Sequence, residues 1–141
     1  MDIAIKHSFD YLTLPSVMTG RDLQEIRLNL GPDAEHMQVI AKIDSLDAVQ
    51  NFNSILKHAD GIIILRDELL MELEPEKLVL AQKWMTQTAN TASVPVFLQS
   101  QVLESMINND VTNIRSQTQD ISNHVMEGAD VFILSHETSV G

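Results

Sequence analysis

The chain has 141 residues and a formal net charge of −11 at pH 7, from 20 acidic and 9 basic side chains. This length predicts one domain and excludes a complete (β/α)8 barrel, which takes about 250 residues. Because the chain has no cysteine, disulfides, thiolate metal sites and cysteine nucleophiles are excluded. The acidic balance argues against a nucleic-acid backbone as the partner.

Neither the amino terminus nor the apolar segments indicate secretion or membrane insertion. The first residues, MDIAIKH, lack the basic and apolar regions of a signal peptide. The longest apolar runs, such as Ile62–Leu65, are too short to cross a bilayer. With 44% apolar residues, a chain of this size can form a core. We therefore expect a cytoplasmic protein with neither a membrane nor a nucleic acid as partner.

Strand-like and helix-like segments alternate along the first half of the chain. Short apolar runs alternate with segments whose apolar residues repeat at helical spacing. Ser45 precedes one such segment and is placed to cap it. The predicted elements are a strand at 11–15, a helix at 20–30, a strand at 38–44, a helix at 46–56 and a strand at 61–66.

The second half continues the alternation. An acidic run at 67–76 is predicted to be an exposed loop and helix start. Pro75 suits the first turn of a helix, and Ser116 with Gln119 resembles a capping box. The predicted elements are a helix at 75–88, a strand at 94–100, a short helix at 102–107, a helix from Ser116 to Gly128 and a strand at 129–135.

This order predicts an α/β fold of parallel β/α repeats. A helix between each pair of strands implies parallel strands with right-handed connections. In such folds, chemistry gathers at the carboxyl ends of the strands. Four of the five predicted strands end in polar residues, namely Lys42 and Asp44; Arg66, Asp67 and Glu68; Ser100; and Ser135, His136 and Glu137.

The residues at these strand ends allow two interpretations. Lys42 and Asp44 are two apart, so they share one face of a strand, as do Ser135 and Glu137. With Glu68 at the same height on the next strand, a lysine and two carboxylates would bind a phosphorylated anion through a divalent metal. The alternative is a simple lysine–carboxylate pair without a ligand. The histidines His7, His36, His58 and His124 are predicted to lie at the surface or at helix ends.

Six motifs, in order and at nearly fixed spacing, resemble the pyruvate kinase family along essentially the whole chain. The family reads SKIE, DGIMVARGDLG, EKVxLAQK, ATQMLESM, DVANAVLDGAD and LSGETAKG. The chain reads AKID at 41–44, DGIIILRDELL at 60–70, EKLVLAQK at 76–83, QSQVLESM at 99–106, DISNHVMEGAD at 120–130 and LSHETSVG at 134–141.

The resemblance implies a partial TIM barrel, in which the five strands are similar to strands four to eight of the family's catalytic barrel. We expect residues 1–141 to be a single partial barrel domain, with the lid domain and the C-terminal regulatory domain absent. The family's residues for potassium and the nucleotide phosphates belong to the missing first part.

The resemblance also implies roles for individual residues. Lys42 stands where the family's lysine stabilises the phosphoryl group in flight. Asp44 and Glu68 stand where the family's acids bind Mg²⁺ or Mn²⁺. Ser100 replaces an active-site threonine and keeps its hydroxyl. Ser135 and Glu137 match the positions associated with the proton relay.

Three family glycines are replaced. Asp67 stands in place of the glycine whose backbone N–H helps bind the substrate carboxylate, and it adds bulk and like charge. Leu70 replaces the second glycine of that turn, where a positive φ would strain it. His136 replaces a glycine near the proton relay. The general pattern of the barrel is thus kept better than its active-site residues.

Two functions follow from these patterns. The first is a catalytically inactive pyruvate-kinase-like protein with a structural or interaction role. Its open barrel would need a protein partner, a second copy or a further chain segment. The second is a part of an active pyruvate kinase, which transfers phosphate between phosphoenolpyruvate and ADP, to give pyruvate and ATP, with Mg²⁺ or Mn²⁺ and K⁺. A weaker third interpretation is an acidic metal- or anion-binding module.

Overall fold

A computed structural model describes residues 2–100, 102–108 and 115–139. The sheet and helices alternate as expected for an α/β chain. The strands are β1 Tyr11–Leu14, β2 Gln38–Ile43, β3 Gly61–Leu65, β4 Val96–Gln99 and β5 Val131–Ile133. The helices are α1 Asp2–Lys6, α2 Gly20–Leu30, η1 Pro32–Ala34, α3 Leu46–Gln50, α4 Phe52–Leu56, α5 Arg66–Glu72, α6 Pro75–Thr91, η2 Glu104–Ile107, α7 Arg115–Glu127 and α8 His136–Ser139.

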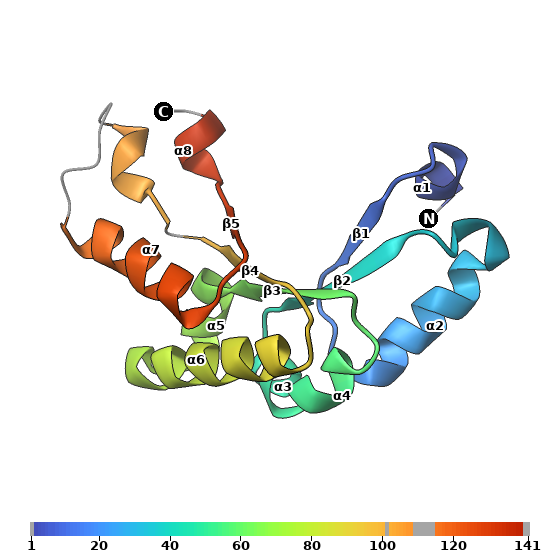
Figure 1. The fold of residues 1–141 in the computed structure, drawn as a ribbon, viewed down its shortest axis with the longest axis horizontal. Coiled ribbons are helices and arrows are strands. Elements are labelled where there is room, and N and C mark those ends of the chain that lie inside the picture. The colour runs from blue at the N-terminus through green and yellow to red at the C-terminus, as the bar shows by residue number, and fades with distance from the viewer. Residues whose placement is uncertain (1, 101, 109–114, 140–141) are drawn as a thin grey trace.

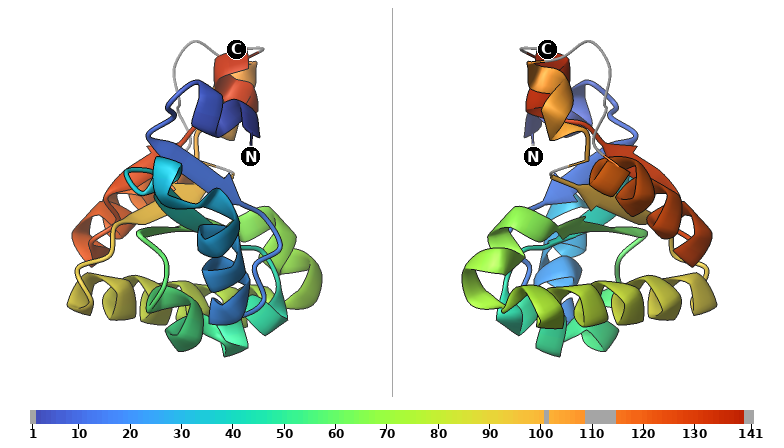
Figure 2. Two further views of the ribbon diagram at one scale, coloured as in Figure 1. Left: turned by 90° about the vertical axis from the view of Figure 1, so that its right-hand side faces the viewer. Right: turned by 90° about the vertical axis from the view of Figure 1, so that its left-hand side faces the viewer.

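The five strands form one parallel sheet in the order β1-β2-β3-β4-β5. The predicted α/β fold of parallel strands alternating with helices is thereby confirmed. The sheet is strongly twisted, so β1 and β2 form one arm and β4 and β5 the other (Figure 1). Helices α2 to α7 lie on the outer side of this bend, and the side views show α6 running along its base (Figure 2).

Alternate strand residues contribute to two separate apolar clusters. The larger one packs the outer face of the sheet on the helices, for example Ile64 on β3 with Phe52 of α4 and Met85 of α6. The smaller one lies on the opposite, inner face and is formed by Ile40, Ile63 and Leu65, with Phe97 and Ile133 against it. Burial of β3 on both faces accounts for its unbroken apolar sequence, as expected for the middle strand of a parallel sheet.

The same hydrogen-bonding pattern occurs at the residues that precede β3 and β5. Asp60 Oδ2 accepts from the backbone N–H of Val39 at 2.7 Å, and Asp130 Oδ2 accepts from that of Val96 at 2.8 Å. The N–H groups of the two aspartates donate in turn to the carbonyls of Val39 and Val96. Each aspartate therefore satisfies both backbone groups of a residue on the neighbouring strand, which fixes the register there.

Three local expectations were wrong. The single helix expected at 46–56 is divided at Asn51, a residue type of modest helix propensity, whose ψ of 11° is not helical. Ser116 lies inside the first turn of α7 and does not precede it. Much of the acidic run at 67–76 is helical, because α5 begins directly after β3. Ser45 does cap α3, by accepting from the N–H of Ala48.

Within the described part of the chain, no helix is both long and apolar enough to span a membrane.

Gly20 generates the first testable prediction. It begins α2, where an added Cβ would lie 2.3 Å from the backbone oxygen of Ser54 and 2.8 Å from the His58 ring. We expect Gly20→Ala to lower the free energy of unfolding by about 1–3 kcal/mol, because α2 and α4 must separate to relieve the clash. Urea titration measures the change. Arg21→Ala, at the exposed next position of the same helix, serves as the control and should change stability by less than about 0.5 kcal/mol. Equal effects would contradict the close contact.

Candidate functional site

The predicted site residues lie at or just beyond the carboxyl ends of four strands. Lys42 is the penultimate residue of β2, and the others follow strand ends directly or within a few residues. Their positions are Asp44 after β2, Asp67 and Glu68 in the first turn of α5, Ser100 after β4, and Ser135 and Glu137 after β5. Parallel strands bring these ends to one edge of the sheet.

Lys42 lies on the inner face of the sheet. It alternates with the outward-packed Ala41 and Ile43 and follows Ile40 of the inner cluster. Its register partner on β3 is Ile63. The ammonium group has no hydrogen bond or ion pair with any described residue, so the simple lysine–carboxylate pair is not formed there.

The two predicted metal ligands differ in their contacts. Asp44 Oδ2 accepts from the backbone N–H of Ser16 at 2.8 Å, which ties the end of β2 to the segment after β1. The Glu68 side chain is exposed. Two carboxylates suit the hard ions Mg²⁺ and Mn²⁺, which are commonly held by one or two carboxylates with water and substrate phosphate. The described residues contain no group of three or more acidic or histidine side chains arranged around one ion.

Asp67 and Ser100 are brought together by the structure. Asp67 Oδ1 accepts from the Ser100 hydroxyl at 2.6 Å and from the backbone N–H of Glu68 at 3.1 Å. Ser100 is buried, and its φ of 79° turns the chain sharply after β4. The carboxylate of Asp67 thus accepts from two donors, one in its own helix and one in the turn after β4.

Two expectations about the neighbouring positions were wrong. Leu70 lies inside α5 and is not among the residues with positive φ, so it carries no left-handed strain. Ser135 and Glu137 do not share a strand face, because β5 ends at Ile133 and Glu137 belongs to α8. Glu137 Oε2 instead accepts from the backbone N–H of Ser135 at 3.0 Å.

Arg66 is a buried residue for which the sequence patterns predict no role. Its Nε and Nη2 donate to the carbonyl oxygen of Ser100 at 3.1 and 2.6 Å. Its Nη1 donates to Asp120 Oδ2 at 2.6 Å in an ion pair with α7. A buried guanidinium requires such partners. Arg66 therefore connects the end of β3 with the turn after β4 and with α7.

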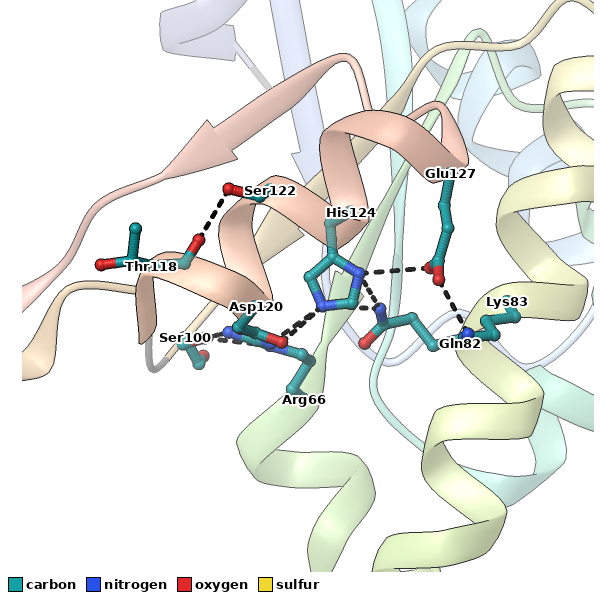
Figure 3. Close-up of polar contacts among 9 residues, drawn as sticks. All are labelled: Arg66, Gln82, Lys83, Ser100, Thr118, Asp120, Ser122, His124 and Glu127. Atoms are coloured by element: carbon teal, nitrogen blue, oxygen red, sulfur yellow. Dashed lines mark hydrogen bonds and ion pairs between the residues drawn. The ribbon is translucent and has the colours of Figure 1, made fainter. Parts of the chain in front are cut away.

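His124 extends this cluster. It lies in the last turn of α7, as predicted for a helix-end residue, but it is buried and not at the surface. Its ring lies between Asp120, Gln82 and Arg66 (Figure 3). Its Nε2 is 2.8 Å from Asp120 Oδ1, and its Nδ1 is 2.8 Å from the Gln82 amide nitrogen. The signal in the sequence was the helical spacing of Asp120 and His124, four residues apart on one face.

The ionisation of Asp120 is set by this cluster. Burial by itself would raise its pKa, but hydrogen bonds from His124 and Arg66, and attraction to their charges, lower the pKa to about 2. Asp120 therefore remains a carboxylate over the whole neutral range.

These features define a segment of a β/α barrel with a polar cluster at the carboxyl ends of its strands. A family model described as "Pyruvate kinase, barrel domain" matches residues 1–141. The chain therefore belongs to the pyruvate kinase barrel-domain family, as the six motifs predicted.

Individual relatives agree with this assignment. The chain is 36% identical over 137 residues to pyruvate kinase of Dictyostelium discoideum, covering 97% of the chain and 27% of the relative. It is 37% identical over 141 residues to pyruvate kinase of Eimeria tenella, covering 100% and 26%. It is 36% identical to the cytosolic pyruvate kinase isozyme of Glycine max, covering 97% and 27%. The chain thus spans about a quarter of the length of these relatives.

The low pKa of Asp120 predicts a pH dependence. Because its folded pKa of about 2 lies below the ordinary value of 3.8, the ionised carboxylate stabilises the fold at and above about pH 5. This stabilisation should be lost as pH falls from about 4 towards 2. Denaturant unfolding of the wild type and Asp120→Asn should show a stability difference at pH 6 that shrinks towards pH 2. Asp10→Asn, at an exposed site, is the control. A difference that stays constant with pH would contradict the ion pair.

Proposed function

We propose that this chain is a catalytically inactive pyruvate-kinase-like barrel segment with a structural or interaction role. The observation that carries the proposal is the 2.6 Å hydrogen bond from the Ser100 hydroxyl to the Asp67 carboxylate. By resemblance to the family, position 67 provides a backbone N–H to the substrate carboxylate, and position 100 holds an active-site hydroxyl. Both positions differ in residue type from the family motif, and here the two side chains bind each other.

The chemical consequence is competition for the Ser100 hydroxyl. The Asp67 carboxylate already accepts from this hydroxyl, and it also accepts from the backbone N–H of Glu68. A negatively charged substrate would have to displace it and would meet its charge at short range. Phosphoenolpyruvate binding is therefore disfavoured both by the occupied hydroxyl and by the negative charge of Asp67.

The inactive chain would act as one partial barrel domain whose open edges need covering. Strands β1 and β5 each have one edge without a neighbouring strand of the described sheet. Exposed parallel edges tend to pair with other chains. A protein partner, a second copy or a further segment of a longer polypeptide would serve, and the cytosol is the location we propose.

A second function is favoured by Lys42. Its ammonium group has no hydrogen-bond or ion-pair partner among the described residues. It is therefore available to an incoming phosphoryl group. In this alternative the chain is part of an active pyruvate kinase acting on phosphoenolpyruvate and ADP. Lys42 would stabilise the transferred phosphoryl charge.

In that alternative, the remaining predicted residues would hold the ions and the proton. Asp44 and Glu68 would bind Mg²⁺ or Mn²⁺, which neutralises phosphate charge when present. Ser100 would contact the substrate, and Ser135 with Glu137 would hold the proton destined for the enolate. By resemblance to the family, K⁺ would be bound by residues outside this segment.

Removal of the Asp67 carboxylate tests the first proposal. Asp67→Gly, in the protein at its native length, should bind oxalate, a small dicarboxylate, roughly tenfold more tightly than the wild type, because one like charge and one competing acceptor are gone. Calorimetry measures the affinity. Asp10→Gly makes the same chemical change at an exposed site and should leave binding unchanged. Equal oxalate affinity in the wild type and Asp67→Gly would contradict the competition.

A coupled assay for pyruvate formation separates the two functions. With phosphoenolpyruvate, ADP, Mg²⁺ and K⁺, we expect no turnover above background by the native-length protein. Measurable turnover that disappears in Lys42→Met but persists in the exposed-site variant Lys57→Met would overturn the inactive proposal and support the alternative.

A further inference from the structure

Arg66 fixes the turn that carries Ser100. Two of its nitrogens, Nε and Nη2, donate to the Ser100 carbonyl, and Nη1 donates to Asp120 Oδ2. The guanidinium is planar and rigid, so its position sets where the Ser100 backbone can lie. Whatever moves Arg66 will therefore move this turn.

His124 lies directly beside that guanidinium. Its Nε2 is 3.3 Å from Arg66 Nη1 and 2.8 Å from Asp120 Oδ1, so the ring and the guanidinium share one carboxylate. In the family motif DVANAVLDGAD the corresponding position is alanine, whereas this chain reads DISNHVMEGAD. The ring is thus an added titratable group at the centre of the cluster.

Charged groups surround the ring from each helix packed against it. Arg66 belongs to α5, and Asp120 and Glu127 belong to α7. From α6, Lys83 pairs with Glu127 Oε1 at 2.9 Å, and the Gln82 amide nitrogen contacts the ring. Glu127 Oε2 lies 3.4 Å from His124 Nδ1. Apart from the ring, the charges in the cluster sum to zero. The two cations are Arg66 and Lys83, and the two carboxylates are Asp120 and Glu127.

The neutral ring satisfies the two shortest of these contacts. With its proton on Nε2 it donates to Asp120, and the bare Nδ1 accepts from the Gln82 amide at 2.8 Å. The ring then carries no charge towards Arg66. The guanidinium keeps its bonds to Ser100 and to the second oxygen of Asp120.

The protonated ring changes three contacts at once. A second proton on Nδ1 ends acceptance from Gln82 and makes Glu127 Oε2 its acceptor. The positive charge then lies 3.3 Å from Arg66 Nη1 and repels it. Asp120, whose pKa of about 2 keeps it ionised, is attracted to both cations.

We propose that His124 is a positioning residue whose protonation shifts Arg66 and, through it, the Ser100 turn at the end of β4. The turn therefore responds to the protonation of this ring. This inference depends only on the cluster contacts and holds whether the barrel segment is catalytic or not.

Nuclear magnetic resonance can test it on the native-length protein. We expect the Arg66 Nε–H and Ser100 amide resonances to shift with pH, with the same midpoint as the His124 ring signal. His124→Ala, the family-like residue, and His124→Gln, which keeps a polar side chain, should both lose these shifts. His36→Ala removes an exposed histidine and should keep them.

Two results would overturn the proposal. One is an Arg66 or Ser100 signal that does not change while the His124 ring titrates in the wild type. The other is a pH-dependent shift that survives in either folded His124 variant. Because the readout is a resonance position rather than turnover, failure here is distinguishable from failure of the proposed function.

Discussion

The buried guanidinium of Arg66 is the interaction on which the end of the sheet depends. It follows β3 without an intervening loop and contacts the Ser100 carbonyl after β4 and the Asp120 carboxylate of α7. A buried charge is tolerated only with partners that compensate its lost hydration, so all three segments must assemble together. The low pKa of Asp120 follows from its hydrogen bonds to the His124 ring and to this guanidinium.

The Asp67–Ser100 contact is the second interaction at the end of the sheet. Asp67 stands where the family motif has glycine, and its carboxylate accepts from the Ser100 hydroxyl. This hydrogen bond gives each of the two side chains a partner within the chain. Lys42, on the neighbouring part of the inner face, has no such internal partner among the described residues.

Much of the fold could be predicted from local patterns. All five strands were expected because each is a short apolar run. Helix α2 was expected because its apolar residues repeat at helical spacing, and α6 because Pro75 suits the first turn of a helix. The predictions of a single helix across Asn51 and of one strand face shared by Ser135 and Glu137 were wrong. Periodicity gives little information where an element is only four or five residues long, because side-chain caps and packing then decide its limits.

The sequence by itself determined the order of strands and helices, the family, and the polar residues expected at the strand ends. Only the tertiary structure decided which of those residues meet. Ser100 binds Asp67 across 33 positions, and His124 reaches Arg66 across 58. Such contacts leave no periodic signal in the chain, because they arise from the twist of the sheet and the packing of α7 beside α6. For that reason the sequence could predict that Lys42 lies at a strand end, but it could not predict the contacts of Arg66 or the burial of His124.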